Sequence, residues 1–111
     1  MDYAKMNQET GEYFQDMGKL DADKLKAFRV MHGDIMEGVL DKKTKELMAI
    51  ALALVAPCAH CIALHVKAAM DLGMTREELS ETIWVATLMG GGPALMHGKE
   101  ALQAFDQFFE E

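Results

Sequence analysis

Hydrophobic and polar residues along the chain recur with the period of helices, and no segment alternates as a strand does. Glycine and proline interrupt the sequence at Gly18, Gly38, Pro57 and Gly73, and residues 90–93 read Gly-Gly-Gly-Pro. Because these two residue types end or break helices, they divide the chain into six helical segments. The pattern therefore predicts an all-α protein of about six helices.

Local signals mark where several of these helices begin. Asp21 and Asp41 are suited to be N-caps, and the run Thr-Arg-Glu-Glu from Thr75 to Glu78 is a capping box. Pro93 is favoured in the first turn of a helix, so it predicts the start of the last one. The first helix is expected at about residues 7–17.

The predicted helices differ in how much of their surface is apolar. Residues 25–39 place apolar side chains at steps of three and four, which predicts a helix with one apolar face. Residues 47–56 are apolar on all sides, which predicts a helix in the middle of the structure. A fourth helix is expected to start at about Cys58, directly after Pro57, so that the two helices form a central hairpin.

The composition bounds the size of the protein and its assembly. The chain has 111 residues, which fits a single domain over residues 1–111. Hydrophobic residues make up 50% of it, a high share for a small monomer whose surface needs polar cover. We therefore expect a homo-oligomer.

Charge and hydropathy narrow the partners and the location. The net charge of −7 repels nucleic-acid phosphates and anionic lipid headgroups, so neither nucleic acid nor a membrane is an expected partner. The first eight residues lack the apolar core of a signal peptide, and the apolar run 47–57 is about half a membrane span. We expect a cytoplasmic protein, in which two nearby cysteines indicate redox work or a metal site.

The candidate chemistry lies at the start of the predicted fourth helix. Cys58 and Cys61 are three residues apart, so their side chains share a face and can form a small disulfide ring. A helix start favours the thiolate, which is the nucleophilic form of cysteine. His65 follows Cys61 by four residues on the same face, where an imidazole can take or return the thiol proton.

Glu46 completes this candidate site by a hairpin estimate. At about 1.5 Å per residue it lies about 16 Å before the Pro57 corner, and His65 lies about 12 Å after it. Antiparallel helices would therefore place the two nearly level, so the carboxyl group can meet the imidazole. Glu46 also precedes ten apolar or small residues, a partly desolvated setting that suits a group handing protons on.

Glu46, Cys58-Ala59-His60-Cys61 and His65 together resemble the signature E-x11-C-x-H-C-x3-H of alkylhydroperoxidase D and its relatives in the carboxymuconolactone decarboxylase-like family. The resemblance continues through residues 73–78 and 89–93. It implies an alkylhydroperoxidase D-like helical bundle whose central hairpin carries the cysteine pair. It also implies that Cys61 attacks, that Cys58 resolves, that Glu46 and His65 relay the proton, and that His60 supports the site.

The expected function is that of a thiol-dependent peroxidase or disulfide oxidoreductase with an antioxidant role. The substrate would be a hydroperoxide or a disulfide, and an external dithiol would restore the thiols. The resemblance suggests a lipoyl or peroxiredoxin-type protein as the reductant and a trimer or hexamer as the assembly. Neither a cofactor nor a metal is expected.

Several alternatives stay open at this point. The helix start favours ionising Cys58, whereas His65 favours Cys61, and we side with Cys61. The cysteines and His65 could instead bind structural zinc, or be buried without chemistry. A decarboxylase-type enzyme on the same fold is a further alternative, although relatives with that activity lack the cysteine pair. His60 is rotated by about 100° from Cys61, so it serves either the site or a subunit contact.

Overall fold

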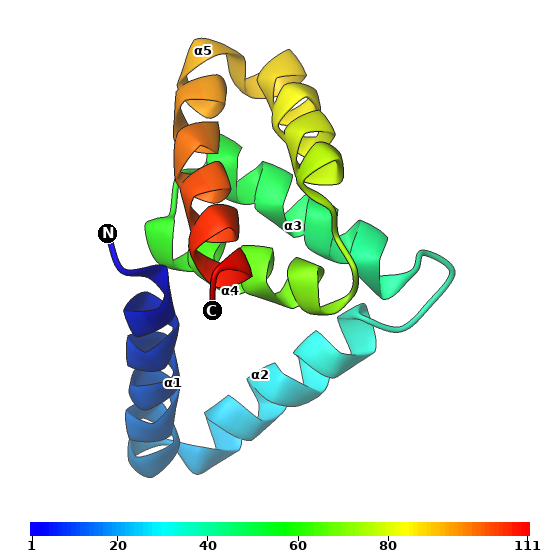
Figure 1. Ribbon diagram of the computed structural model, residues 1–111. Helices are drawn as coiled ribbons and strands as arrows, with labels where there is room; N and C mark the ends of the chain where they lie inside the picture. Colours follow the sequence, from blue (N-terminus) through cyan, green and yellow to red (C-terminus); the bar gives the residue numbers. More distant parts are fainter.

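The computed structural model describes all 111 residues, and every regular element in it is a helix (Figure 1). In chain order these are α1 (Tyr3–Leu20), α2 (Ala22–Ile35), α3 (Lys42–Val55), α4 (Ala59–Asp71) and α5 (Arg76–Phe109). The predicted all-α class is confirmed. None of the helices is both long enough and apolar enough to cross a membrane.

Five helices are found instead of six because the last two join at a sharp bend. Gly91 lies inside α5 with φ 66° and ψ −156°, a conformation that favours glycine. Pro93 follows the bend in the first turn of the second arm, as predicted. The two arms of α5 then run side by side (Figure 1), and Arg76 and Asp106 pair across them at 2.9 Å.

The predicted N-caps of three helices are confirmed. The side chains of Asp21 and Asp41 accept hydrogen bonds from the first turns of α2 and α3, and Thr75 and Glu78 form the capping box of α5. The first helix is longer than predicted at both ends. Gly18 does not end it, because its backbone does not turn left-handed. An interior glycine with a helical backbone costs only about 1 kcal/mol relative to alanine.

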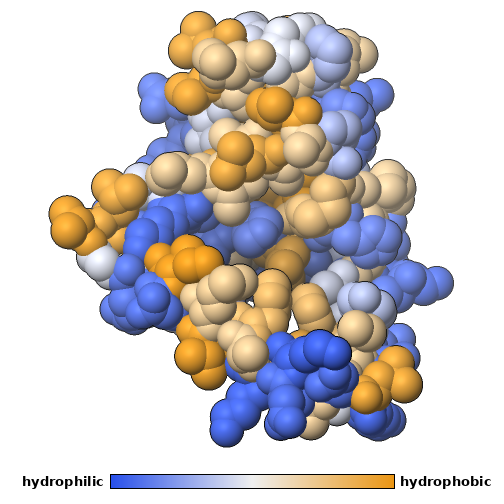
Figure 2. All heavy atoms as spheres, turned by 180° about the vertical axis from the view of Figure 1, so that it is seen from behind, coloured by the Kyte–Doolittle hydropathy of each residue, from blue (hydrophilic) through white to orange (hydrophobic).

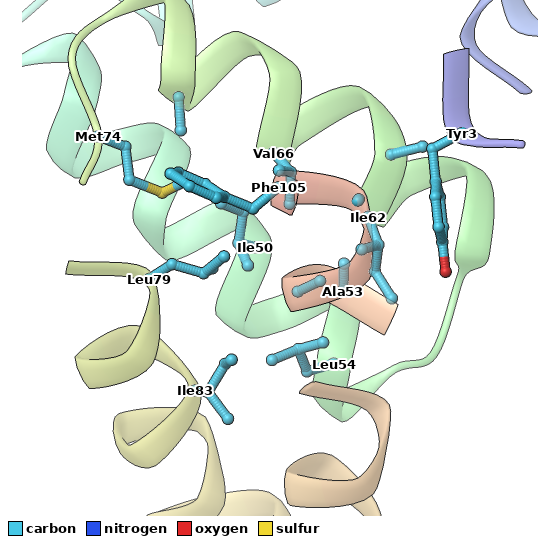
Figure 3. Close-up of a cluster of buried hydrophobic side chains, with 14 of the residues drawn as sticks. Tyr3, Ile50, Ala53, Leu54, Ile62, Val66, Met74, Leu79, Ile83 and Phe105 are labelled. Carbon is cyan, nitrogen blue, oxygen red and sulfur yellow. The ribbon is translucent and has the colours of Figure 1, made fainter. Parts of the chain in front are cut away.

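The core is formed by α3, α4 and both arms of α5. Five large side chains from these helices are almost fully buried and point toward one another (Figure 3): Ile50, Leu54, Ile62, Val66 and Leu79. The start of α1 joins this core through Tyr3, whose hydroxyl donates to the Gln103 side chain at 3.2 Å. The N-terminal part of α1 is therefore held against the second arm of α5.

The predicted apolar face of α2 exists, but this chain does not cover it. The helix α2 packs only against α1, the two forming an open V, and none of its residues is buried (Figure 1). Phe28, Met31 and Ile35 are 47%, 52% and 55% exposed. The periodicity gave the apolar face correctly up to Ile35, where the helix ends, because spacing fixes which side chains share a face but not what covers them.

The prediction that the third helix lies in the middle is wrong for one of its sides. Ile50 and Leu54 of α3 are buried, but Leu52 is 67% exposed and Met48 50% exposed. The first arm of α5 also exposes large apolar side chains, among them Leu88. A helix that is apolar all round is half covered by this chain, and its other side is left at the surface.

Two helical glycines offer a matched test of the packing. A Cβ atom at Gly98 would lie 2.6 Å from Ile83 Cγ2, whereas one at Gly33 would meet nothing within 4 Å. Gly98→Ala is expected to lower the free energy of unfolding by about 1–3 kcal/mol through overpacking. Gly33→Ala should raise it by about 0.5–1 kcal/mol, because alanine favours the helix. Urea unfolding followed by circular dichroism measures both, and equal effects would contradict the close packing of the two α5 arms.

Candidate active site

The two cysteines lie at the corner between α3 and α4. Pro57 has no backbone N–H and follows the last residues of α3, so the chain turns there. Cys58 is the N-cap of α4, and Cys61 lies in its first turn. A disulfide joins the two residues, whose Cα atoms are 5.2 Å apart. The predicted pairing is therefore present in the structure.

The Cys58 sulfur also takes part in capping α4. It accepts a hydrogen bond from the Cys61 backbone N–H at 3.2 Å, in the place where a serine or aspartate oxygen usually caps a helix. Both cysteines are half-buried. When the disulfide is reduced, this N–H and the positive end of the helix dipole favour negative charge on the Cys58 sulfur.

Glu46 and His65 meet across the α3–α4 hairpin, as the hairpin estimate predicted. Glu46 Oε2 lies 2.7 Å from His65 Nδ1. The glutamate is 5% exposed, and the imidazole keeps 25% of its side-chain surface exposed. A buried carboxyl group therefore holds a histidine that stands one turn along α4 from Cys61.

This pair can hold and move a proton. When Glu46 is ionised, its carboxylate only accepts hydrogen bonds, so the Nδ1 atom of His65 that faces it then carries the hydrogen. In the neutral ring the other nitrogen, Nε2, is then free to take a proton. The Glu46 carboxylate also stabilises the charged imidazolium that results, which is the role of a positioning and charge-balancing partner.

His60 lies apart from the Glu46–His65 pair. Its side chain is exposed, and it makes no hydrogen bond or ion pair within the chain. Its predicted support of the site therefore stays a prediction. No three His, Cys, Asp or Glu side chains come together in an arrangement that could hold a metal ion.

A second histidine–glutamate pair is present far from the cysteines in sequence. His97 Nδ1 lies 3.1 Å from Glu100 Oε1, both on the second arm of α5. Both side chains are about one-third exposed, unlike Glu46. This pair is a natural control for the pair beside the cysteines.

Sequence reasoning missed the cavity beside His65. Its volume is about 360 Å³, and it is lined by Phe14, Phe28, Arg29, His32, Gly33, Leu64 and His65. Five of these residues belong to α1 and α2, more than 30 positions before His65. No spacing rule connects them to α4, because only the tertiary arrangement of the V brings them there.

The fold and the site together define an all-helical protein with a cysteine pair at a helix start, beside a half-buried histidine that contacts a buried glutamate. The model of the carboxymuconolactone decarboxylase family matches residues 22–104. The chain belongs to this family. The family resemblance of the sequence is thereby confirmed.

Known relatives agree with this assignment. The chain is 46% identical over 71 residues to an uncharacterized protein of the cox locus of Paracoccus denitrificans, a match that spans 64% of each chain. It is 35% identical over 99 residues to an uncharacterized protein of Cupriavidus necator, or 88% of each chain. A weaker match is the alkyl hydroperoxide reductase AhpD of Nocardia farcinica, 32% identical over 59% of this chain and 36% of that one.

Solved structures share the fold. A carboxymuconolactone decarboxylase family protein from Legionella pneumophila superposes with a TM-score of 0.91 at 38% identity, covering 96% of each chain. A protein from Thermotoga maritima gives a TM-score of 0.77 at 28% identity, covering 97% of this chain and 93% of the other. The overall helical arrangement is thus shared with a solved member of this family.

Proposed function

We propose that the protein is a thiol-dependent peroxidase that cycles between a dithiol and the Cys58–Cys61 disulfide. The observation that carries this proposal is the joint placement of the disulfide-forming pair at the start of α4 and the Glu46–His65 contact one turn further. The similarity to an AhpD protein supports it. The finer roles of the four residues follow from their chemistry.

The cycle begins with the reduced protein. His65 takes the proton of the Cys61 thiol, and the thiolate attacks the outer oxygen of a hydroperoxide. The O–O bond breaks, the alcohol leaves with the proton that His65 returns, and Cys61 becomes a sulfenic acid. The Cys58 thiol then gives up its proton and attacks the Cys61 sulfur, so that the S–S bond forms, the S–O bond breaks, and the hydroxide leaves with that proton as water. An external dithiol reduces the disulfide and is itself oxidised.

The same thiolate can attack a sulfur atom, so a disulfide substrate is the second candidate of the same class. The mixed disulfide would form on Cys61, and Cys58 would release the second thiol. We propose a lipoyl or peroxiredoxin-type protein as the first reductant to test. A reducing compartment such as the cytoplasm suits such a cycle.

Thiol titration tests the proposal against the zinc alternative. We expect the reduced protein to show two fast-reacting thiols per chain, with the same rate in the presence and absence of a chelator, and to consume an organic hydroperoxide. The control is the oxidised protein, which should show none. If the thiols react slowly until a chelator is added, and the chelator removes one zinc per chain, the proposal is wrong.

The family name raises lactone decarboxylation as another activity for this fold. Cysteine thiols have no necessary part in that chemistry. If the Cys58→Ser and Cys61→Ser variants keep the full enzymatic activity of the wild type, that result would therefore favour a decarboxylase-type enzyme. The presence of the cysteine pair supports the redox alternative.

We also propose a homo-oligomer, a trimer or hexamer. The exposed apolar side chains support it, since a small monomer rarely leaves so many at its surface. On α3 and the first arm of α5 they include Met48, Leu52, Val55, Trp84 and Leu88. Light scattering of the purified protein gives the number of chains directly.

A further inference from the structure

The cavity beside His65 has the size of a small-molecule site. Its volume of about 360 Å³ lies within the usual range of ligand pockets. Figure 2 shows a hollow on this side of the molecule, between the bundle and the α1–α2 corner, with hydrophobic spheres inside it and hydrophilic ones beside it. Asn7 of α1 donates a hydrogen bond to the Ala63 carbonyl of α4 at 3.1 Å, which holds these two walls together.

The inner walls of the cavity are apolar. Phe14 and Phe28 stack with ring centroids 6.0 Å apart and an angle of 22° between the rings, and Leu64 lines the α4 side. The lining contains no acidic side chain. Such walls bind a hydrocarbon group, because covering it removes apolar surface from water.

The α2 rim of the cavity carries one positive charge, that of the Arg29 guanidinium. Arg29 and His32 line it from α2, and neither forms an ion pair within the chain. A free guanidinium here is notable, because the protein as a whole carries a net charge of −7. Arginine offers a planar set of N–H donors that matches a carboxylate, so this rim favours an anionic headgroup.

The cavity also reaches the candidate proton carrier. His65 lines it and at the same time contacts Glu46 through Nδ1. A molecule that lies along the phenylalanines with its carboxylate at Arg29 therefore has another part of its chain beside His65. The cavity thus joins an anion site, an apolar wall and the proposed proton relay.

We infer that the cavity binds an amphipathic carboxylate, and that the preferred oxidant is a hydroperoxide with an apolar chain and a free carboxylate, such as a fatty-acid hydroperoxide. This inference rests on the proposed peroxidase function for the reaction, but not for the binding. The reaction keeps the balance given above: the hydroperoxide becomes the corresponding hydroxy acid, and the two thiols become the disulfide. Arg29 acts as a specificity residue, since it touches the headgroup and not the reacting oxygen.

A matched pair of substrates and variants tests the inference. The ratio of kcat/KM for hydroperoxy-octadecadienoic acid to that for its methyl ester is measured in the wild type, in Arg29→Gln and in Lys26→Gln. Lys26→Gln is the control, because it removes the same charge from the same helix. Lys26 does not line this cavity. We expect Arg29→Gln to lower the ratio about fivefold, the effect of a partly exposed charge-assisted contact, and Lys26→Gln to leave it unchanged.

Binding of decanoate, measured by calorimetry, gives a readout without turnover. We expect it to bind the wild type and Lys26→Gln alike and to bind Arg29→Gln more weakly. If all three proteins turn over both substrates with the same ratio of kcat/KM for the acid to kcat/KM for the ester, the inference is overturned. The proposed function would still stand in that case. No turnover of either substrate, together with decanoate binding that depends on Arg29, would overturn the proposed function and keep the carboxylate site.

A second copy of the chain is the competing occupant of this cavity. Phe28 is 47% exposed, so Phe28→Ala removes apolar surface that another copy could cover. We expect Phe28→Ala to weaken decanoate binding with no change in the number of chains seen by light scattering. Dissociation of an assembly with unchanged decanoate binding would assign the cavity to a contact between copies and overturn the inference.

Discussion

Cys61→Ser is expected to lower the rate of hydroperoxide reduction by at least about a thousandfold, because it removes the nucleophile itself. Serine is close in size to cysteine, and Cys61 is only half-buried, so the fold should survive. The backbone N–H of residue 61 that caps against Cys58 also stays in place. The measurement is steady-state consumption of an organic hydroperoxide with dithiothreitol as the reductant.

Cys58→Ser is the matched control for this variant. Mixed with hydroperoxide after dithiothreitol has been removed, it should react once, since Cys61 and His65 remain, and then stop. Without Cys58 the sulfenic acid on Cys61 has no resolving thiol in the chain, so dimedone should trap it. If dimedone instead traps a sulfenic acid on Cys58 in the Cys61→Ser variant, Cys58 is the attacking cysteine and Cys61 the resolving one. The helix start alone would favour that arrangement.

Glu46→Gln and His65→Ala are each expected to slow the reaction about 100-fold, the lower range for loss of general acid–base catalysis. Glutamine keeps the shape of Glu46 but cannot balance the charge of an imidazolium. Both variants act on the pair in which His65 Nδ1 lies 2.7 Å from Glu46 Oε2. The rate constant for thiol oxidation is measured against pH, and at high pH, where the thiol ionises unaided, both variants should approach the wild-type rate.

His97→Ala controls for the general effect of removing a histidine that contacts a glutamate. Its partner Glu100 is more exposed than Glu46, and neither residue lines the cavity at His65. We expect a rate close to that of the wild type over the whole pH range. Equal losses in His97→Ala and His65→Ala, or a loss in Glu46→Gln that high pH does not reduce, would contradict the proton relay.

The role of Cys58 also follows from its position at the helix cap. Its sulfur accepts the Cys61 N–H, and the dipole of α4 favours negative charge at this end. A stabilised thiolate is a good leaving group when a reductant attacks the Cys61 side of the disulfide. In the cycle that we propose, the cap therefore serves the reductive half, whereas Glu46 and His65 serve the oxidative half.

The sequence was sufficient to predict the features that depend on local geometry. Spacing of three and four residues placed Cys58, Cys61 and His65 on one face of a helix, and a constant rise per residue brought Glu46 level with His65. Capping preferences gave the starts of α2, α3 and α5. These features were predictable because each depends on only a few neighbouring residues or on one hairpin.

Features that depend on how the helices pack could not be predicted in this way. The cavity needs Phe28 and Arg29 of α2 to face Leu64 of α4, and the direction of α2 is set at its junction with α1. The hydrophobic pattern also could not predict that one side of α3 is exposed. A helix with apolar residues on all sides does not show how many of them a single chain covers.

In the proposed cycle, one hydroperoxide molecule converts the reduced cysteine pair into the Cys58–Cys61 disulfide through His65. A single-turnover experiment tests it most directly: reduced protein is mixed with one equivalent of hydroperoxide in a stopped-flow instrument, quenched, and weighed by mass spectrometry. We expect a product lighter by two hydrogen atoms, with both cysteines in one cross-linked peptide, formed much more slowly in His65→Ala. Unchanged mass with both thiols still free, or equal rates in the two proteins, would contradict it.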